Sequence, residues 1–135
     1  MNDTRTPEEG ALESSLRKIA DWQGLALSYQ RINAGFTNFN YLVHVGEHDR
    51  TYFAKVVGPN TETFIDRKVA HEAAVLAADC GVAPAVVQYV AEDDFEVYEF
   101  LDGFRICTIE DMRDPDVAAK VKAAYARVHR GAPVP

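Results

Sequence analysis

Lys55 and Glu72 are the charged residues whose places in the sequence most strongly suggest chemistry. Lys55 alternates with Phe53 and Val57 in an extended run, so its ammonium points to the same side as these two apolar residues. Glu72 lies in a stripe of helical spacing whose other members are Ile65, Val69, Leu76 and Cys80. Removing one partner of a buried ion pair costs about 3–5 kcal/mol, so a Lys55–Glu72 ion pair is one interpretation. The other is a lysine that extends to solvent and a glutamate at the helix edge.

A second polar group lies in the loop between two extended runs. Gly35 permits a close approach of the backbone to a ligand. The polar and aromatic residues that follow it are Phe36, Thr37, Asn38, Phe39 and Asn40. Such a loop can cover phosphate groups. It lacks the further glycines of a dinucleotide-binding loop and the Gly-Lys-Ser/Thr of a P-loop, so a plain polar hairpin loop is the alternative.

One helix and three antiparallel strands are expected in the first part of the chain, which contains the glycine loop and Lys55. Thr6-Pro7-Glu8-Glu9 combines a hydroxyl cap, a proline at the first helical position and a glutamate three residues after the cap, which predicts a helix over 7–23. Extended runs follow at 25–32, 40–45 and 51–57, separated by the loop at 33–39 and a polar turn at 46–50.

The second half of the chain predicts two helices and two more strands. The helical stripe around Glu72 predicts a helix over 63–80 that ends at Gly81. Short strands are expected at 85–91 and 95–101, joined by an acidic turn. Asp114 then caps a last helix, which ends at Gly131 and carries the stripe Val117, Val121, Ala124 and Val128.

This order of elements resembles the N-terminal lobe of the protein-kinase-like phosphotransferases. Gly35-Phe36-Thr37-Asn38-Phe39-Asn40-Tyr41 is similar to the Gly-x-Thr-Asn-x-Asn-Tyr loop of the choline/ethanolamine kinases. The segments 58–67 and 81–84 are similar to those that follow in the same family. Aminoglycoside phosphotransferases share the lobe but match these segments less closely. The resemblance implies an α+β kinase-like N-lobe, with a five-stranded antiparallel sheet, one main helix on it, and N-terminal and C-terminal helices.

The resemblance also implies roles for individual residues. Lys55 would hold the α- and β-phosphates of ATP, Glu72 would orient Lys55, and the loop would lie over the triphosphate. The loop residues so assigned are Gly35, Phe36, Thr37, Asn38 and Asn40. Glu99 and Leu101 would offer a main-chain carbonyl and amide to the adenine, although an edge strand that runs into a turn would explain this segment equally well.

The sequence departs from the family in the residues that carry phosphoryl transfer. The family uses a later His-x-Asp-x-x-x-x-Asn-like loop and a further aspartate for Mg²⁺, and this sequence contains neither. We therefore assign no catalytic residue and no metal ligand. His129 is interpreted as a cation at the end of the last helix.

Composition narrows the classes of function. With 135 residues, 47% hydrophobic and 26% charged, the chain is typical of one soluble domain. Its net charge of −7 is of the wrong sign for nucleic acid, and no apolar stretch suggests a membrane span, so a cytoplasmic location is expected. Cys80 and Cys107 show no metal-site spacing and are expected to be buried free thiols.

The leading hypothesis is therefore the ATP-binding lobe of a choline/ethanolamine-kinase-like phosphotransferase, with ATP and Mg²⁺ as cofactors of the complete enzyme. Residues 1–101 would form the lobe, and 102–135 would form a hinge linker and the start of a C-terminal lobe otherwise absent. We expect such a truncated chain to be inactive alone and to self-associate through 114–129. The alternatives are a stand-alone nucleotide-binding or regulatory module, a small interaction domain without nucleotide, and an aminoglycoside as the acceptor.

Overall fold

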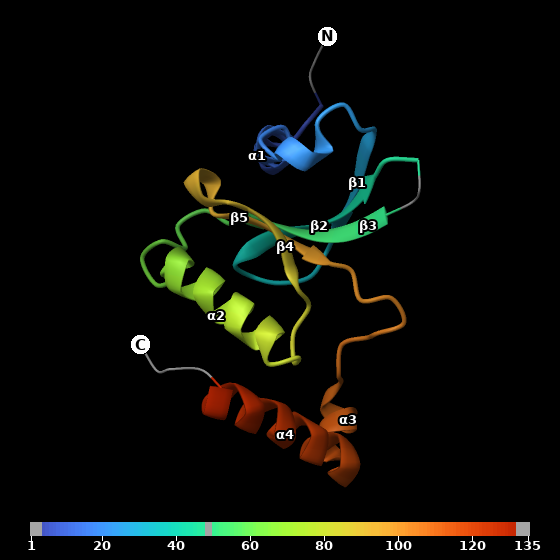
Figure 1. Ribbon diagram of the computed structural model, residues 1–135, viewed down its shortest axis with the longest axis vertical. Coiled ribbons are helices and arrows are strands. Elements are labelled where there is room, and N and C mark those ends of the chain that lie inside the picture. Colours follow the sequence, from blue (N-terminus) through green and yellow to red (C-terminus); the bar gives the residue numbers. More distant parts are fainter. Residues whose placement is uncertain (1–3, 48–49, 132–135) are drawn as a thin grey trace.

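The computed structural model describes residues 4–47 and 50–131, so His48, Asp49 and the C-terminal 132–135 lie outside the described residues. One antiparallel sheet organises the chain, with its five strands in the order β1-β2-β3-β5-β4 (Figure 1). The strands are β1 (Leu27–Ile32), β2 (Asn38–Val45), β3 (Arg50–Val57), β4 (Val86–Val90) and β5 (Phe95–Glu99). The predicted five-stranded antiparallel sheet is confirmed.

The first helix packs on one face of this sheet and forms the core with it. Helix α1 (Pro7–Leu16) begins with the predicted cap, because the Thr6 and Glu9 side chains bond reciprocally to each other's backbone amides. The helix was expected to continue to residue 23, but it stops at Leu16 and is followed by the 3₁₀ turn η1 (Ala20–Trp22). This break lets both Ile19 and Trp22 be buried against the sheet.

The main core lies between α1 and the sheet. Alternate residues of the strands supply its sheet side, namely Tyr41, Val43, Val45, Ala54, Val56, Phe95 and Val97. Since successive side chains of a strand point to opposite faces, the residues between them lie on the second face. Lys55 and Glu96 are on that second face, away from the core.

Helix α2 (Arg67–Asp79) covers this second face, on the opposite side of the sheet from α1 (Figure 1). Asp66 caps it by accepting a hydrogen bond from the Val69 amide. The predicted inward stripe is only partly formed, because Ile65, Leu76 and Cys80 are half-buried, whereas Val69 is 46% exposed and Glu72 is exposed. The side that meets the sheet instead carries His71, whose ring stacks on Tyr89 of β4.

Two helices follow the sheet. Helix α3 (Ile109–Arg113) was not predicted, although Thr108 and Asp111 form a capping box at its start. Helix α4 (Pro115–Gly131) confirms the last predicted helix, and it lies beyond α2, away from the sheet (Figure 1). The predicted acidic turn between β4 and β5 is confirmed, and it has the form of the 3₁₀ turn η2 (Ala91–Asp93).

The two cysteines differ in exposure. Cys80 is half-buried and Cys107 is exposed, and both are free, so the expectation of two buried thiols is wrong for Cys107. Within the described ranges no helix is long and apolar enough to span a bilayer.

Candidate functional site

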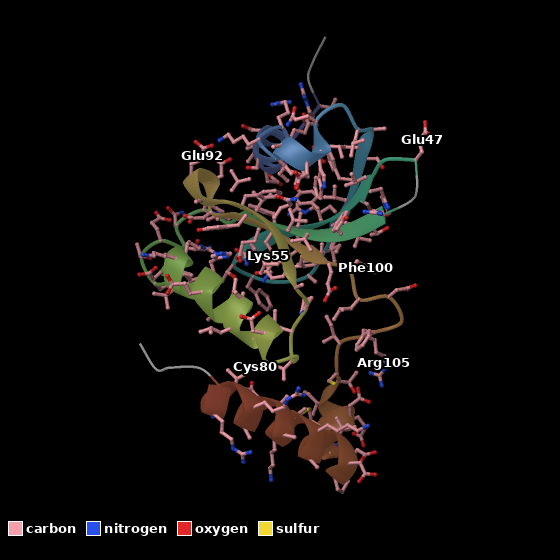
Figure 2. All side chains as sticks on the ribbon, viewed as in Figure 1. Glu47, Lys55, Cys80, Glu92, Phe100 and Arg105 are labelled. Carbon is pink, nitrogen blue, oxygen red and sulfur yellow. The ribbon has the colours of Figure 1, made fainter. Side chains whose placement is uncertain are left out.

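Three polar residues form a row across neighbouring strands on the α2 face of the sheet. Asn40 of β2 is paired in register with Lys55 of β3, and Lys55 is paired with Glu96 of β5. Directly opposite residues of antiparallel strands place their side chains on the same face, with Cβ atoms about 4.5–5.5 Å apart. Lys55 therefore lies between an amide and a carboxylate, in the space between the sheet and α2 (Figure 2).

The Lys55 ammonium contacts an aromatic ring beside this row. Its Nζ lies 4.5 Å from the ring centroid of Tyr98 and 3.5 Å from the Tyr98 hydroxyl, to which it donates. Burial lowers the pKa of Lys55, the nearby Arg67 lowers it further, and the negative charge of Glu96 raises it. Burial also raises the pKa of the Tyr98 hydroxyl, as does its interaction with Glu96. The site thus holds a cation that lacks part of its normal solvation.

Glu96 is held in place from α2. The His71 Nδ1 lies 3.0 Å from Glu96 Oε2, and both side chains are mostly buried. The His71 ring is in turn stacked on Tyr89, with centroids 3.6 Å apart and planes at 12°. These contacts fix the carboxylate that faces Lys55.

The predicted Lys55–Glu72 ion pair is not formed. Glu72 is exposed on α2, and no ion pair of the described residues includes it. The prediction failed because the helix presents His71 to the sheet, one position and about 100° around the helix from Glu72.

Two side chains tie the glycine loop to this face. Asn40 Nδ2 donates to the Ala34 carbonyl at 2.7 Å, and Arg67 Nη1 donates to Asn38 Oδ1 at 2.8 Å. Arg67 also bonds to the hydroxyl of Thr61. Asn40 Oδ1 and Arg67 Nε are buried and have no protein partner in the described part of the chain. Unpartnered buried polar atoms are rare in folded proteins, so an acceptor and a donor remain for a ligand or water.

Two glycines allow the loop to come close to the sheet. Gly35 has a φ of +91°, which other residues rarely adopt, and a Cβ there would lie 3.0 Å from Asn40 Nδ2. A Cβ on Gly58 would lie 2.3 Å from the Thr37 carbonyl oxygen, so only glycine fits beside the loop. Phe36 at the loop tip is fully exposed.

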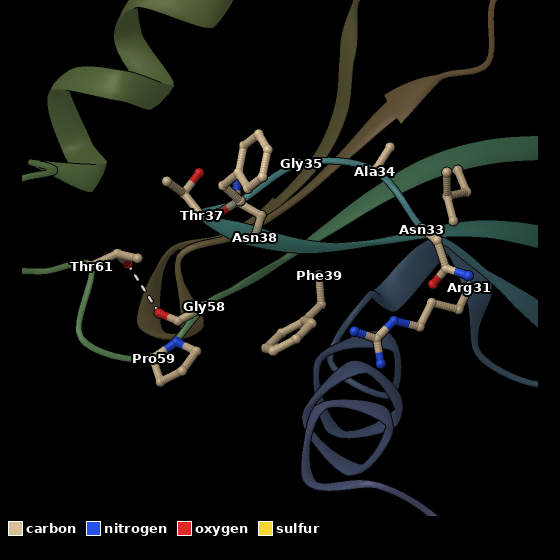
Figure 3. A pocket seen from close by; sticks show the side chains of 12 residues that line it. Arg31, Asn33, Ala34, Gly35, Thr37, Asn38, Phe39, Gly58, Pro59 and Thr61 are labelled. Atoms are coloured by element: carbon tan, nitrogen blue, oxygen red, sulfur yellow. Dashed lines mark hydrogen bonds between the residues drawn. The ribbon is translucent and has the colours of Figure 1, made fainter.

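A hollow of about 460 Å³ lies along the loop and includes Gly35, Phe36, Thr37 and Asn38 (Figure 3). It opens on the side of α1, where Arg31 lies over the Phe39 ring at 4.9 Å. Lys55 and Asn40 do not line it. We place the candidate site on the α2 face instead, because Lys55, Arg67 and two unpartnered buried polar atoms, Asn40 Oδ1 and Arg67 Nε, lie there, whereas the unpartnered Tyr41 hydroxyl lies in the apolar core.

Comparison with known proteins identifies the architecture. No protein-family model and no curated protein matches the sequence. Among solved structures, a choline/ethanolamine kinase family protein from Mesorhizobium loti superposes with a TM-score of 0.70 at 22% identity, over 93% of this chain. An ethanolamine kinase from Plasmodium vivax superposes with a TM-score of 0.56 at 19% identity, over 86% of this chain. The chain spans only 40% and 37% of these two proteins.

The fold is that of a kinase-like N-lobe. In this N-lobe the glycine loop joins β1 to β2, Lys55 lies on β3, and α2 follows β3. The resemblance drawn from the sequence to choline/ethanolamine kinases is therefore confirmed at the level of the fold.

The predicted hinge lies at the end of β5 in the N-lobe. The Glu99 amide donates to the Ala85 carbonyl at 3.0 Å, and the Glu99 carboxylate accepts from the Ala85 amide at 2.9 Å. Leu101 is 37% exposed beyond the strand. Contact of Glu99 and Leu101 with adenine stays a prediction.

The N-lobe offers no preformed metal centre in the residues described. No group of three His, Cys, Asp or Glu side chains within 4–47 and 50–131 could hold a metal ion. The residues that sequence reasoning missed are Arg67, His71, Glu96 and Tyr98. Glu96 alternates with the apolar Phe95 and Val97, but only the pairing of β3 with β5 shows that it faces Lys55.

Proposed function

We propose that this chain is the ATP-binding lobe of a small-molecule phosphotransferase similar to the choline/ethanolamine kinases. The complete reaction would move the γ-phosphate of ATP to the hydroxyl of an amino alcohol. One observation carries this proposal: a half-buried lysine lies beside a tethered glycine loop, on the α2 face of a kinase-like N-lobe. The comparisons support the fold, and the acceptor is inferred from the kinds of protein that share it.

The α2 face suits the phosphates of a nucleotide. Lys55 supplies an incompletely solvated ammonium, which gains most from a phosphate oxygen because that oxygen replaces lost solvation. Arg67 supplies a second cation and a buried N–H donor without a protein partner. Gly35 and the loop amides would cover the phosphates from above, and Glu99 and Leu101 would meet the adenine.

The described residues do not fit a resident Mg²⁺, because they contain no cluster of metal ligands. In a kinase the metal bridges phosphate oxygens and neutralises developing charge. Its ligands would come from the nucleotide and from the part of the complete enzyme that this sequence does not include.

The lobe binds nucleotide in this proposal but does not transfer phosphate by itself. Residues 1–101 form the N-lobe, and 102–135 form the hinge linker and the first part of a C-terminal lobe. The sequence contains no His-x-Asp-x-x-x-x-Asn-like loop to accept the hydroxyl proton. The lack of this loop in the sequence also favours a second candidate function, a nucleotide-binding regulatory module that never acts as a kinase. A coupled assay with choline or ethanolamine should show no turnover by the 135-residue chain under either candidate.

Calorimetric titration with ATP tests the proposal. We expect weak binding by the unaltered chain and at least a tenfold loss in Lys55→Met, because an ionic contact to phosphate is removed. Lys120→Met is the matched control, since Lys120 is exposed on α4. Equal affinity of Lys55→Met and the unaltered chain would contradict the assignment.

A further inference from the structure

We infer that Glu96 of β5, and not Glu72 of α2, is the carboxylate that positions Lys55. This inference rests on the proposed function for its consequence in ATP binding, but the placement of Lys55 can be tested without nucleotide. Glu96 is a positioning residue in this assignment: it acts through Lys55 and does not itself contact phosphate.

The strand register brings Glu96 and Lys55 together. The two residues are direct partners of the antiparallel β3–β5 pair, so their side chains leave the sheet on the same face. Tyr98 lies two residues along β5 on that face and holds the ammonium over its ring. Since the ammonium contacts Tyr98 rather than a carboxylate oxygen, Glu96 acts on it across the intervening space, and Nζ keeps its donors beyond the one that Tyr98 accepts.

Glu96 is better fixed than a residue of α2 could be. Its side chain is 14% exposed and is held by His71, which is stacked on Tyr89. Glu72 is exposed on helix α2 and has no ion pair among the described residues, so its carboxylate is less rigidly placed. A group on a packed strand with a second supporting contact is the arrangement that fixes a site most accurately.

Burial and two charged groups act on the Lys55 ammonium, and the two charged groups oppose each other. Glu96 favours its charged form, whereas Arg67 and burial disfavour it. Glu72 is exposed and does not contribute to this balance. Neutralising Glu96 must therefore lower the pKa of Lys55 further, and neutralising Glu72 must leave it unchanged.

A titration of the lysine side chains by NMR measures this directly. We would follow the ¹³Cε resonance of Lys55, assigned by its loss in Lys55→Met, from pH 7 to 11 in the unaltered chain, Glu96→Gln and the matched control Glu72→Gln. The inference expects a downward shift of the Lys55 titration midpoint in Glu96→Gln only. A shift in Glu72→Gln without one in Glu96→Gln, or no shift in either, would overturn it.

Glu96→Asp provides a second variant if Glu96→Gln does not fold. Aspartate keeps the charge but moves it away from Lys55 by one methylene. The Lys55 titration midpoint should therefore fall between that of the unaltered chain and that of Glu96→Gln. A merely structural role of Glu96 would change the melting temperature and leave the Lys55 midpoint where it is.

ATP titration of the same variants separates this inference from the proposed function. We expect about tenfold weaker binding by Glu96→Gln and unchanged binding by Glu72→Gln. If the unaltered chain does not bind ATP, the proposed function fails, and the Lys55 midpoints still decide which carboxylate positions the lysine. If ATP binds and Glu72→Gln alone weakens it, the inference fails and the proposed function stands.

Discussion

At the scale of single residues, Lys55 links the function of the lobe to its stability. Burial lowers its pKa, which means that its surroundings favour the neutral amine over the ammonium relative to the unfolded chain. At pH 7 the residue is charged in both states, so the folded state carries the cost of an incompletely solvated cation. Residues with such a cost are characteristic of binding sites, where a ligand offsets it.

We therefore predict that Lys55→Met raises the free energy of unfolding at pH 7 while it weakens ATP binding at least tenfold. Between the folded-state pKa of Lys55 and 10.5, the folded protein binds fewer protons at this residue than the unfolded chain does. The free energy of unfolding therefore rises with pH in that window. The advantage of Lys55→Met should accordingly shrink as the pH approaches 10.5. Urea unfolding of Lys55→Met and the unaltered chain at pH 7 and pH 10 measures this difference in unfolding free energy. A variant less stable than the unaltered chain at pH 7 would contradict this account.

The sequence predicted Lys55 and missed its surroundings for a physical reason. Strict alternation with Phe53 and Val57 is a local property, and it places Lys55 on one face of β3. Glu96 faces Lys55 only because β5 pairs with β3 across an intervening helix and strand, and no local pattern specifies that register. Glu72 was chosen from helical spacing, which gives a stripe but not the rotation of the helix about its axis.

At the scale of elements, the glycine loop depends on close backbone contact with the end of β3. The Gly58 amide donates to the Thr37 carbonyl at 3.1 Å, and the space for a side chain at Gly58 is filled by that carbonyl. The loop is thus held from below by Gly58 and from the α2 face by Asn40 and Arg67.

Gly58→Ala should cost about 1–3 kcal/mol in unfolding free energy, because its Cβ would lie 2.3 Å from a backbone oxygen that must move. Gly10→Ala is the control: a Cβ there meets nothing within 4 Å on helix α1, so it should stabilise by about 0.5–1 kcal/mol. Denaturant unfolding of both variants makes the comparison. Equal stability of Gly58→Ala and the unaltered chain would show that the loop is not held as described.

A helix boundary could be predicted only where the residues that determine it are close together in the sequence. The start of α1 was predicted because Thr6 and Glu9 form a capping box that is visible in the sequence. The early end of α1 was not predicted, because the helix stops where Ile19 and Trp22 become buried against strands that are distant in the sequence. Helix α3 has an equally clear box at Thr108, but its five residues are too few to show a period.

At the scale of the whole molecule, the two faces of the sheet differ in composition and in what they carry. The α1 face is apolar and carries the core, and the α2 face is polar and carries the candidate site. Beyond the sheet, the segment from β5 to α4 exposes large apolar side chains, among them Phe104, Ile106, Ile109 and Tyr125. The predicted stripe of α4 is only half-buried, because no residue of α4 is fully covered.

We predict that the purified chain self-associates through this region, since large apolar side chains exposed to water favour contact with those of another copy. The double variant Ile106→Lys, Ile109→Lys should shift the chain toward monomer in sedimentation velocity experiments. Leu25→Lys is the control, because Leu25 is an exposed apolar residue that lies before β1 and outside this region, and this variant should not shift the chain toward monomer. A monomer at all concentrations would contradict the prediction for the unaltered chain.

Binding of the phosphates of a nucleotide to the α2 face is tested by mapping ATP-induced shifts of backbone and lysine resonances by NMR. We expect ATP to move the signals of Gly35, Asn40, Lys55 and Arg67, with little change at Leu12, Val43 and other residues of the α1 face. Shifts confined to the α1 face, or no saturable shift at millimolar ATP, would contradict it.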